Sequence, residues 1–165
     1  MRLGTHLIGA TAAATAYYTI SPLSFTDIAT VGGVYLASSI AGGLLPDICS
    51  PRSWIGRRLP LIATIISKTF GHRTFTHSFL FLFIIYFFTQ SIEGEWGLAV
   101  QTGLLVGIAS HLLLDMMTSR GVHLFFPIKF PVRFPFFTKT GSTLGEGSIA
   151  VLLTLWVVYF AVTYL

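Results

Sequence analysis

The sequence is poor in charge, and this scarcity restricts the class of protein more than any other feature. Asp, Glu, Lys and Arg make up only 10% of the 165 residues, whereas 53% are hydrophobic and the mean hydropathy is +0.78. A soluble domain contains about 25% charged residues, and disordered or nucleic-acid-binding tails need charge or low hydrophobicity. These classes are excluded, and no nucleic-acid partner is expected. The composition predicts an integral membrane protein.

The sequence has too few cysteines for an intrachain disulfide, and its long apolar runs lack the proline that would break a helix. The one cysteine, Cys49, excludes an intrachain disulfide framework, and none of the long apolar runs contains a proline. A helix needs about 20 mostly apolar residues to cross hydrocarbon. We therefore expect an all-α integral membrane protein, a single membrane domain over 1–165 with a bundle of about five transmembrane helices. The expected spans are 4–20, 28–45, 77–92, 97–117 and 148–164.

Two further segments are expected to lie at the membrane surface. Residues 53–70 contain a short apolar stretch flanked by basic residues, which indicates an interfacial or re-entrant amphipathic helix. Residues 122–139 alternate aromatic side chains with prolines and basic residues, a spacing that excludes a helix.

Basic residues are absent from one side of this predicted bundle. All ten lysines and arginines fall on the side of the N-terminus, and the opposite loops hold only Asp27, Glu93 and Glu95. Cytoplasmic loops carry an excess of Lys and Arg. We therefore expect a multi-pass protein of the cell membrane with a cytoplasmic N-terminus and an external C-terminus.

Each predicted span brings a histidine or a carboxylate to the cytoplasmic face. These groups are His6, Asp47, His72, His77, His111, Asp115 and Glu146. Ionisable groups within or just beneath a membrane cost free energy and are functional candidates. His111 and Asp115 are four residues apart and share a helix face. Thr76 or Ser78 can cap the helix that begins near His77.

Imidazole and carboxylate donors with few thiols suit zinc, manganese or iron better than calcium. We expect one or two divalent metal ions, with zinc as the first choice and manganese or iron as alternatives. The predicted metal ligands are His6, Asp47, His72, His77, His111 and Asp115. Asp115 or Glu146 is the candidate general base, and Arg73 is the candidate for holding a phosphate oxygen.

Taken together, these motifs resemble those of the YdjM-like family, which is regarded as a family of inner-membrane metal-dependent hydrolases. The matching strings include Gly4-Thr5-His6-Leu7, Leu45-Pro46-Asp47, Gly71-His72-Arg73, Thr76-His77-Ser78, Ser110-His111, Asp115-Met116 and the late Glu146. The resemblance extends from residue 4 to residue 146, and it implies a helical membrane protein with a metal site.

The chain departs from the family pattern at one position of interest. The family reads Leu-Pro-Asp-x-Asp, and Cys49 stands here in place of the second acid. If that acid is a metal ligand, the Cys49 thiolate replaces it and makes the site softer. If the acid lies outside the coordination shell or acts as a base, the substitution alters or abolishes activity.

The sequence leaves two kinds of function open. The first is a membrane-bound metal-dependent hydrolase with its active site at the cytoplasmic face, where metal-activated water attacks a phosphoester or lipid-type substrate. Its partner would be a membrane lipid or a lipid-linked substrate, an expectation that rests on location alone. The alternative is a non-catalytic metal-binding transporter, sensor or structural membrane protein. Transport sites usually lie near the bilayer midplane between repeated halves, and no repeat is visible here. The oligomeric state is not fixed by the sequence.

Overall fold

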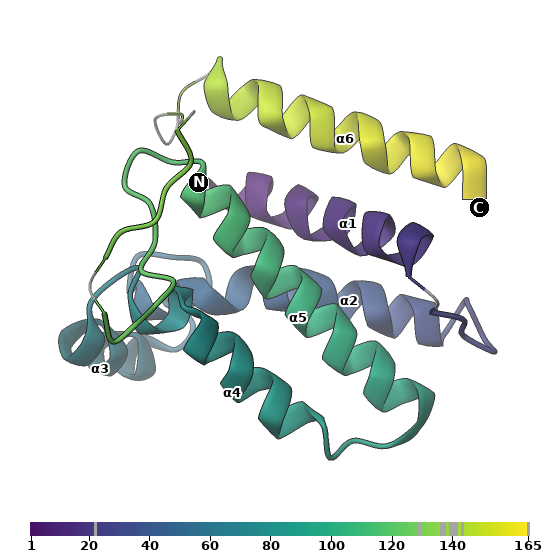
Figure 1. Ribbon diagram of the computed structural model, residues 1–165, viewed down its shortest axis with the longest axis horizontal. Helices are drawn as coiled ribbons and strands as arrows, with labels where there is room; N and C mark the ends of the chain where they lie inside the picture. The colour runs from purple at the N-terminus through teal and green to yellow at the C-terminus, as the bar shows by residue number, and fades with distance from the viewer. Residues whose placement is uncertain (22, 129, 136–137, 139–141, 143, 165) are drawn as a thin grey trace.

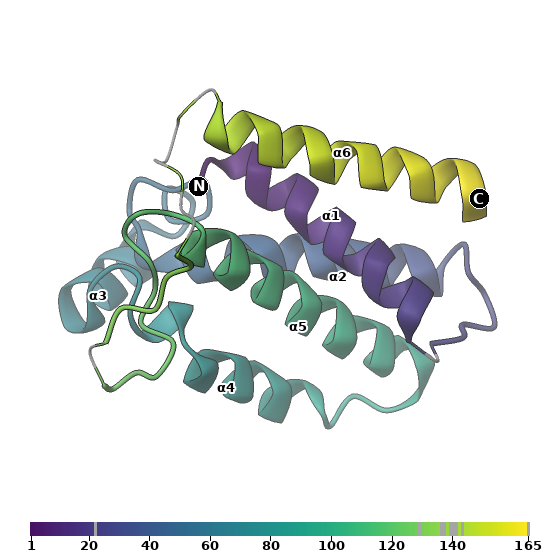
Figure 2. The ribbon, with the colours of Figure 1, turned by 45° about the horizontal axis from the view of Figure 1, so that its top comes forward.

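Helices running side by side with alternating direction make up most of the molecule (Figures 1 and 2). The computed structural model describes residues 1–21, 23–128, 130–135, 138, 142 and 144–164. Its elements are α1 (Leu3–Ile20), α2 (Val31–Leu44), the 3-10 helix η1 (Leu45–Cys49), α3 (Pro60–Phe70), the 3-10 helix η2 (Phe75–His77), α4 (Phe79–Thr89), α5 (Gly94–Met116) and α6 (Gly145–Tyr164). The described residues contain isolated β-bridges but no strand. The all-helical class is confirmed.

Among the described residues, three helical stretches are long and apolar enough to cross a membrane, namely Val31–Cys49, Gly94–Met116 and Gly145–Tyr164. The helix within the predicted span 77–92 is shorter than expected, because η2 and Ser78 precede α4 and the helix ends at Thr89. The Ser78 hydroxyl accepts a hydrogen bond from the Phe81 amide and caps α4. The count of about five spans stays a prediction.

Large apolar side chains cover the outside of the molecule. Phe83 and Phe88 of α4 are 62% and 70% exposed, and Leu152 and Val162 of α6 are 67% and 82% exposed. Large exposed apolar patches are rare on soluble monomers. Lipid contact accounts for this exposure, in agreement with a membrane protein.

Small residues let α2 and α5 pack at backbone distance. A Cβ added to Gly107 would lie 2.0 Å from the Ser39 carbonyl oxygen, and one added to Gly42 would lie 2.3 Å from the Leu104 carbonyl oxygen. Such small-residue contacts are typical of helix pairs in membranes. The close packing fixes the last turns of α5 against the end of α2.

The helix ends that carry ionisable groups gather at one end of the bundle, which we call the site end. Figure 1 shows there the start of α1, the end of α2, the start of α4, the end of α5 and the start of α6. Within the predicted segment 53–70 the chain forms α3, and the described residues of 122–139 form no helix. Lys129 and Lys139 lie outside the described residues.

Candidate metal centre

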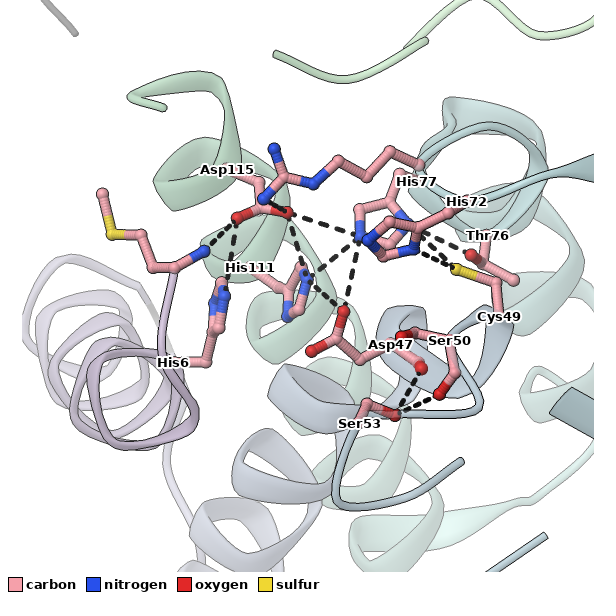
Figure 3. Close-up of polar contacts among 12 residues, drawn as sticks. His6, Asp47, Cys49, Ser50, Ser53, His72, Thr76, His77, His111 and Asp115 are labelled. Carbon is pink, nitrogen blue, oxygen red and sulfur yellow. Dashed lines mark hydrogen bonds and ion pairs between the residues drawn. The ribbon is translucent and has the colours of Figure 1, made fainter. Parts of the chain in front are cut away.

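Donor atoms from α5, η1 and η2 converge at the site end (Figure 3). Nε2 of His77 and Nε2 of His111 are 3.2 Å apart. Oδ2 of Asp115 lies 3.5 Å from the first nitrogen and 3.8 Å from the second. Oδ1 of Asp47 lies 4.0 Å and 3.9 Å from the same two atoms. Tetrahedral zinc with bonds of about 2.0–2.2 Å separates its ligand atoms by about 3.3–3.6 Å, so the cluster is close to the size that one ion requires.

The hydrogen bonds of the two histidines direct Nε2 of each ring toward the cluster. Nδ1 of His111 lies 2.7 Å from the Gly43 carbonyl oxygen, which only accepts, so this nitrogen carries the proton and Nε2 of the neutral ring does not. Nδ1 of His77 faces the Thr76 hydroxyl at 3.1 Å, which leaves its Nε2 toward the cluster. His77, His111 and Asp115 are at most 1% exposed. The Nε2 lone pair of His111, with Nε2 of His77 and a carboxylate close to it in a buried site, forms a set of donor atoms that a cation can occupy. The residues therefore fit a metal ion.

His6 belongs to a second, overlapping donor group with His111 and Asp115. Its Nε2 lies 3.5 Å from Oδ1 of Asp115, and its ring stacks on that of His111 with centroids 3.8 Å apart. Nδ1 of His6 is buried and has no hydrogen-bond partner in the described part of the chain. Since His111 offers only Nε2, the two groups compete for that ligand. Asp115 links the two groups, because its Oδ1 faces His6 and its Oδ2 faces His77 and His111.

The negative charge of Asp115 is balanced by two cations. Nη2 of Arg73 lies 2.9 Å from its Oδ2, and the Met1 ammonium lies 2.6 Å from its Oδ1. Arg73 also donates to the Thr118 hydroxyl at 2.8 Å, and its carbonyl accepts from the His123 amide. Its φ of 63° is unfavourable for a residue with a side chain and persists only where the surroundings hold it. The structure thus fixes Arg73 against Asp115.

His72, a predicted ligand, lies outside both donor groups. Its Nδ1 is 3.1 Å from Sγ of Cys49, and the side chain lies at the surface. Sγ of Cys49 is in turn 4.0 Å from Nδ1 of His77, the ring edge that faces away from the donor cluster. The position of the family's second acid is therefore behind a donor histidine. Groups placed there orient a ligand imidazole and tune its basicity.

Glu146, a predicted general base, is also outside the two donor groups. It is 4% exposed, and its Oε1 accepts hydrogen bonds from the Thr5 hydroxyl at 2.8 Å and from the Arg2 amide. These bonds join the start of α6 to the start of α1. The Asp47 side chain, by contrast, is 28% exposed.

A cavity of about 710 Å³ opens beside the donor atoms. Asp47, His72, Arg73 and Asp115 contribute to its wall. Ligand pockets are typically about 300–1,000 Å³ in volume. The cavity thus gives a small molecule access to Asp47 and Asp115.

The sequence does not identify the groups that orient these donors. In the sequence, nothing distinguishes Thr76 and Thr118 from other residues beside the motifs. The structure shows that their hydroxyls contact His77 and Arg73. The Gly43 carbonyl leaves no side-chain signal at all, although it lies in the last turn of α2, where carbonyls lack helical partners. That general property of helix ends is the only available clue.

The profile of the YdjM inner membrane protein family matches residues 1–165. The chain belongs to this family. Among similar proteins, YvsG of Bacillus subtilis (strain 168) is 40% identical over 159 residues, which cover 94% of this chain and 91% of YvsG. Inner membrane protein YdjM of Escherichia coli (strain K12) is 37% identical over 126 residues, which cover 74% of this chain.

The match spans 64% of the length of the Escherichia coli YdjM protein. No solved structure matches the chain significantly. Membership in the YdjM family confirms the resemblance seen in the motifs, and it agrees with the membrane location that composition and helix length indicate.

Proposed function

We propose that the chain is a membrane-bound metal-dependent hydrolase with its active site at the cytoplasmic membrane face. The observation that carries the proposal is the convergence of His77, His111, Asp115 and Asp47 on one point beside a cavity that is lined by the two aspartates. Two imidazoles and a carboxylate match the ligand set of many catalytic zinc sites. Zinc is the proposed ion, and manganese and iron are compatible with the same donors.

The residues divide into ligands and a proton acceptor. His77, His111 and Asp115 have the shorter mutual distances and are buried, so we assign them as the ligands. Asp47 is farther from both histidines and partly exposed to the cavity, so we assign it as the general base. A bound divalent ion would lower the pKa of a water molecule and polarise a phosphoryl or carbonyl oxygen.

The substrate class is argued from location and charge. The site lies at the end of the bundle where, by the positive-inside rule, the cytoplasmic headgroups are expected. A phosphoester on a membrane lipid or a lipid-linked carrier would reach the cavity from there. We therefore propose a phosphoester or lipid-type substrate.

A structural metal site is the alternative that the same geometry supports. If Asp47 also ligates the ion, the shell contains four protein donors and is closed, as in structural zinc sites. The Asp47→Asn variant separates the two functions. A hydrolase keeps its metal and loses turnover in this variant, whereas a closed structural site loses metal.

Metal content of the detergent-purified protein, measured by ICP-MS beside turnover of a panel of phosphoesters, tests the proposal. We expect near-stoichiometric metal in the wild type and little in His77→Ala or Asp115→Ala. His123→Ala is the matched control, because this histidine is outside both donor groups. A wild-type protein that binds none of zinc, manganese or iron after reconstitution would contradict the proposal.

A further inference from the structure

The cavity beside the donor atoms is lined by more arginine than its carboxylates require. Arg52, Arg57 and Arg120 contribute to its wall in addition to Arg73. Arg52 and Arg57 come from the loop after η1, and Arg120 follows the end of α5. Segments far apart in the sequence therefore bring positive charge to one opening.

These three arginines are not used by the acids of the site. Asp115 pairs with Arg73 and the Met1 ammonium, and the ion-pair distances of Asp47 are to His77 and His111. Among the described residues, none of Arg52, Arg57 and Arg120 forms an ion pair (Figure 3 draws the pairs of the cluster itself). A bound divalent ion would add to their excess positive charge.

The loop that carries two of them is tied to the donor cluster. The Ser53 hydroxyl donates to the carbonyl oxygens of Asp47 and Ser50, each at 2.8 Å, and accepts from the Gly56 amide at 2.9 Å. The chain is so tight there that a Cβ on Gly56 would lie 1.9 Å from the Ser50 carbonyl oxygen. Arg52 adjoins Ser53, and the Arg57 amide donates to the Ser53 carbonyl oxygen at 3.1 Å, so the backbone of both arginines is tied to the turn that holds Asp47.

We propose that Arg52, Arg57 and Arg120 form a binding site for a phosphate group at the mouth of the cavity. Guanidinium groups match phosphate oxygens with paired hydrogen bonds and keep their charge at every physiological pH. Three unpaired guanidinium groups around one opening select a ligand with two or more negative oxygens. Arg73, held by Asp115 and Thr118, does not take this part.

We call these three arginines the rim. As a site for substrate, the rim rests on the proposed hydrolase, because a phosphate group bound there would hold the substrate of that enzyme. The binding claim is separable, because phosphate binding needs no turnover. A lipid headgroup and a soluble phosphate ester share this chemistry, and the experiment distinguishes them.

The test is isothermal titration of the detergent-purified, zinc-loaded full chain with four probes. These are inorganic phosphate, glycerol phosphate, dioctanoyl phosphatidic acid and the phosphate-free dioctanoyl glycerol. Arg52→Gln, Arg57→Gln and Arg120→Gln are made singly and together. Arg58→Gln is the matched control, because Arg58 adjoins Arg57 but stacks 3.5 Å above the Trp54 ring and is not in the cavity wall.

We expect each single variant to weaken binding of the phosphate probes about tenfold and the triple variant to weaken it further. Arg58→Gln should stay within about twofold of the wild type. Binding of phosphatidic acid alone assigns the rim to a lipid headgroup, and binding of glycerol phosphate as well assigns it to phosphate in general. Dioctanoyl glycerol should not bind.

Two results would overturn the inference. One is a triple variant that binds as tightly as the wild type, and the other is an equal loss in Arg58→Gln, which would indicate a general charge effect. Metal content, measured on every variant, reports folding and separates the two proposals. If the wild-type protein binds metal but no phosphate, only the proposed phosphate site is refuted. If it binds no metal, the proposed hydrolase function is refuted.

Discussion

At the end of the bundle opposite the donor groups, acidic side chains accept hydrogen bonds from threonines at sites accessible to solvent. The exposed Asp27 accepts a hydrogen bond from the Thr30 hydroxyl at 2.6 Å, and Glu95 accepts one from the Thr26 hydroxyl at 2.7 Å. At the site end, Asp115 and Glu146 are 1% and 4% exposed and bond to groups more than 100 positions away in the sequence.

The difference between the two ends shows which ionisable groups need explanation. A carboxylate that caps a turn in water costs little and needs no ligand to account for it. A carboxylate buried among histidines from other helices costs free energy unless something compensates its charge. One polar end of this membrane protein is therefore ordinary surface, and the other has the properties of a binding site.

The largest expected contrast is between Asp115→Asn and Asp27→Asn. Asp115→Asn removes the charge that Arg73 and the Met1 ammonium face, and leaving buried charges unpaired costs about 3–5 kcal/mol. We expect this variant to lose metal and to unfold at a lower temperature in detergent. Asp27→Asn should leave metal content and melting temperature unchanged, and similar effects in the two variants would remove the distinction between the ends.

Removing the metal should destabilise the wild type through the site end alone. An ion present at about 1,000 times its dissociation constant stabilises the folded state by about 4 kcal/mol. A chelator should therefore lower the melting temperature of the wild type by several degrees and leave that of His77→Ala unchanged. A shift of the same size in His77→Ala would place the bound metal elsewhere.

A third contrast concerns the packing that supports the site. In Gly107→Ala the new Cβ meets the Ser39 carbonyl at 2.0 Å, whereas the position of a Cβ at Gly33 has nothing within 4 Å. We expect Gly107→Ala to cost about 1–3 kcal/mol by forcing α2 and α5 apart, with weaker metal binding as a consequence. Gly33→Ala should be neutral in thermal unfolding monitored by circular dichroism, and it serves as the control.

The smallest expected effect is that of His72→Ala. Because His72 contacts Cys49 and is outside both donor groups, its loss should leave stoichiometric metal and weaken affinity by at most about tenfold. Competition with a chromogenic chelator measures the affinity. Complete loss of metal would indicate that His72 is a ligand and that the turn before η2 rearranges when the ion binds.

The sequence predicts the helices and their common polar end because these are properties of single segments. Apolar run length locates α2, α5 and α6, and the placement of charge indicates which helix ends meet. The bounds of α4 are harder to predict, because η2 and Ser78 occupy the start of the predicted span 77–92 and the helix already ends at Thr89.

The sequence also predicts the types of donor at the site but not which way each one faces. His72 and His77 are separated by a turn in which Arg73 has a φ of 63°. Side-chain direction across such a turn does not follow a helical period, so spacing cannot show that His72 turns to Cys49. Spacing likewise places Glu146 near the site, but it cannot show that the carboxylate accepts its hydrogen bonds from the start of α1.

X-ray absorption at the zinc edge of the reconstituted protein tests the central claim most directly. If His77, His111 and Asp115 hold the ion with Cys49 behind the ring, the spectrum shows nitrogen and oxygen neighbours at about 2.0–2.2 Å with imidazole scattering. It shows no sulfur shell, and Cys49→Ser leaves it unchanged. A sulfur neighbour at about 2.3 Å that disappears in Cys49→Ser would make Cys49 a ligand and contradict the account.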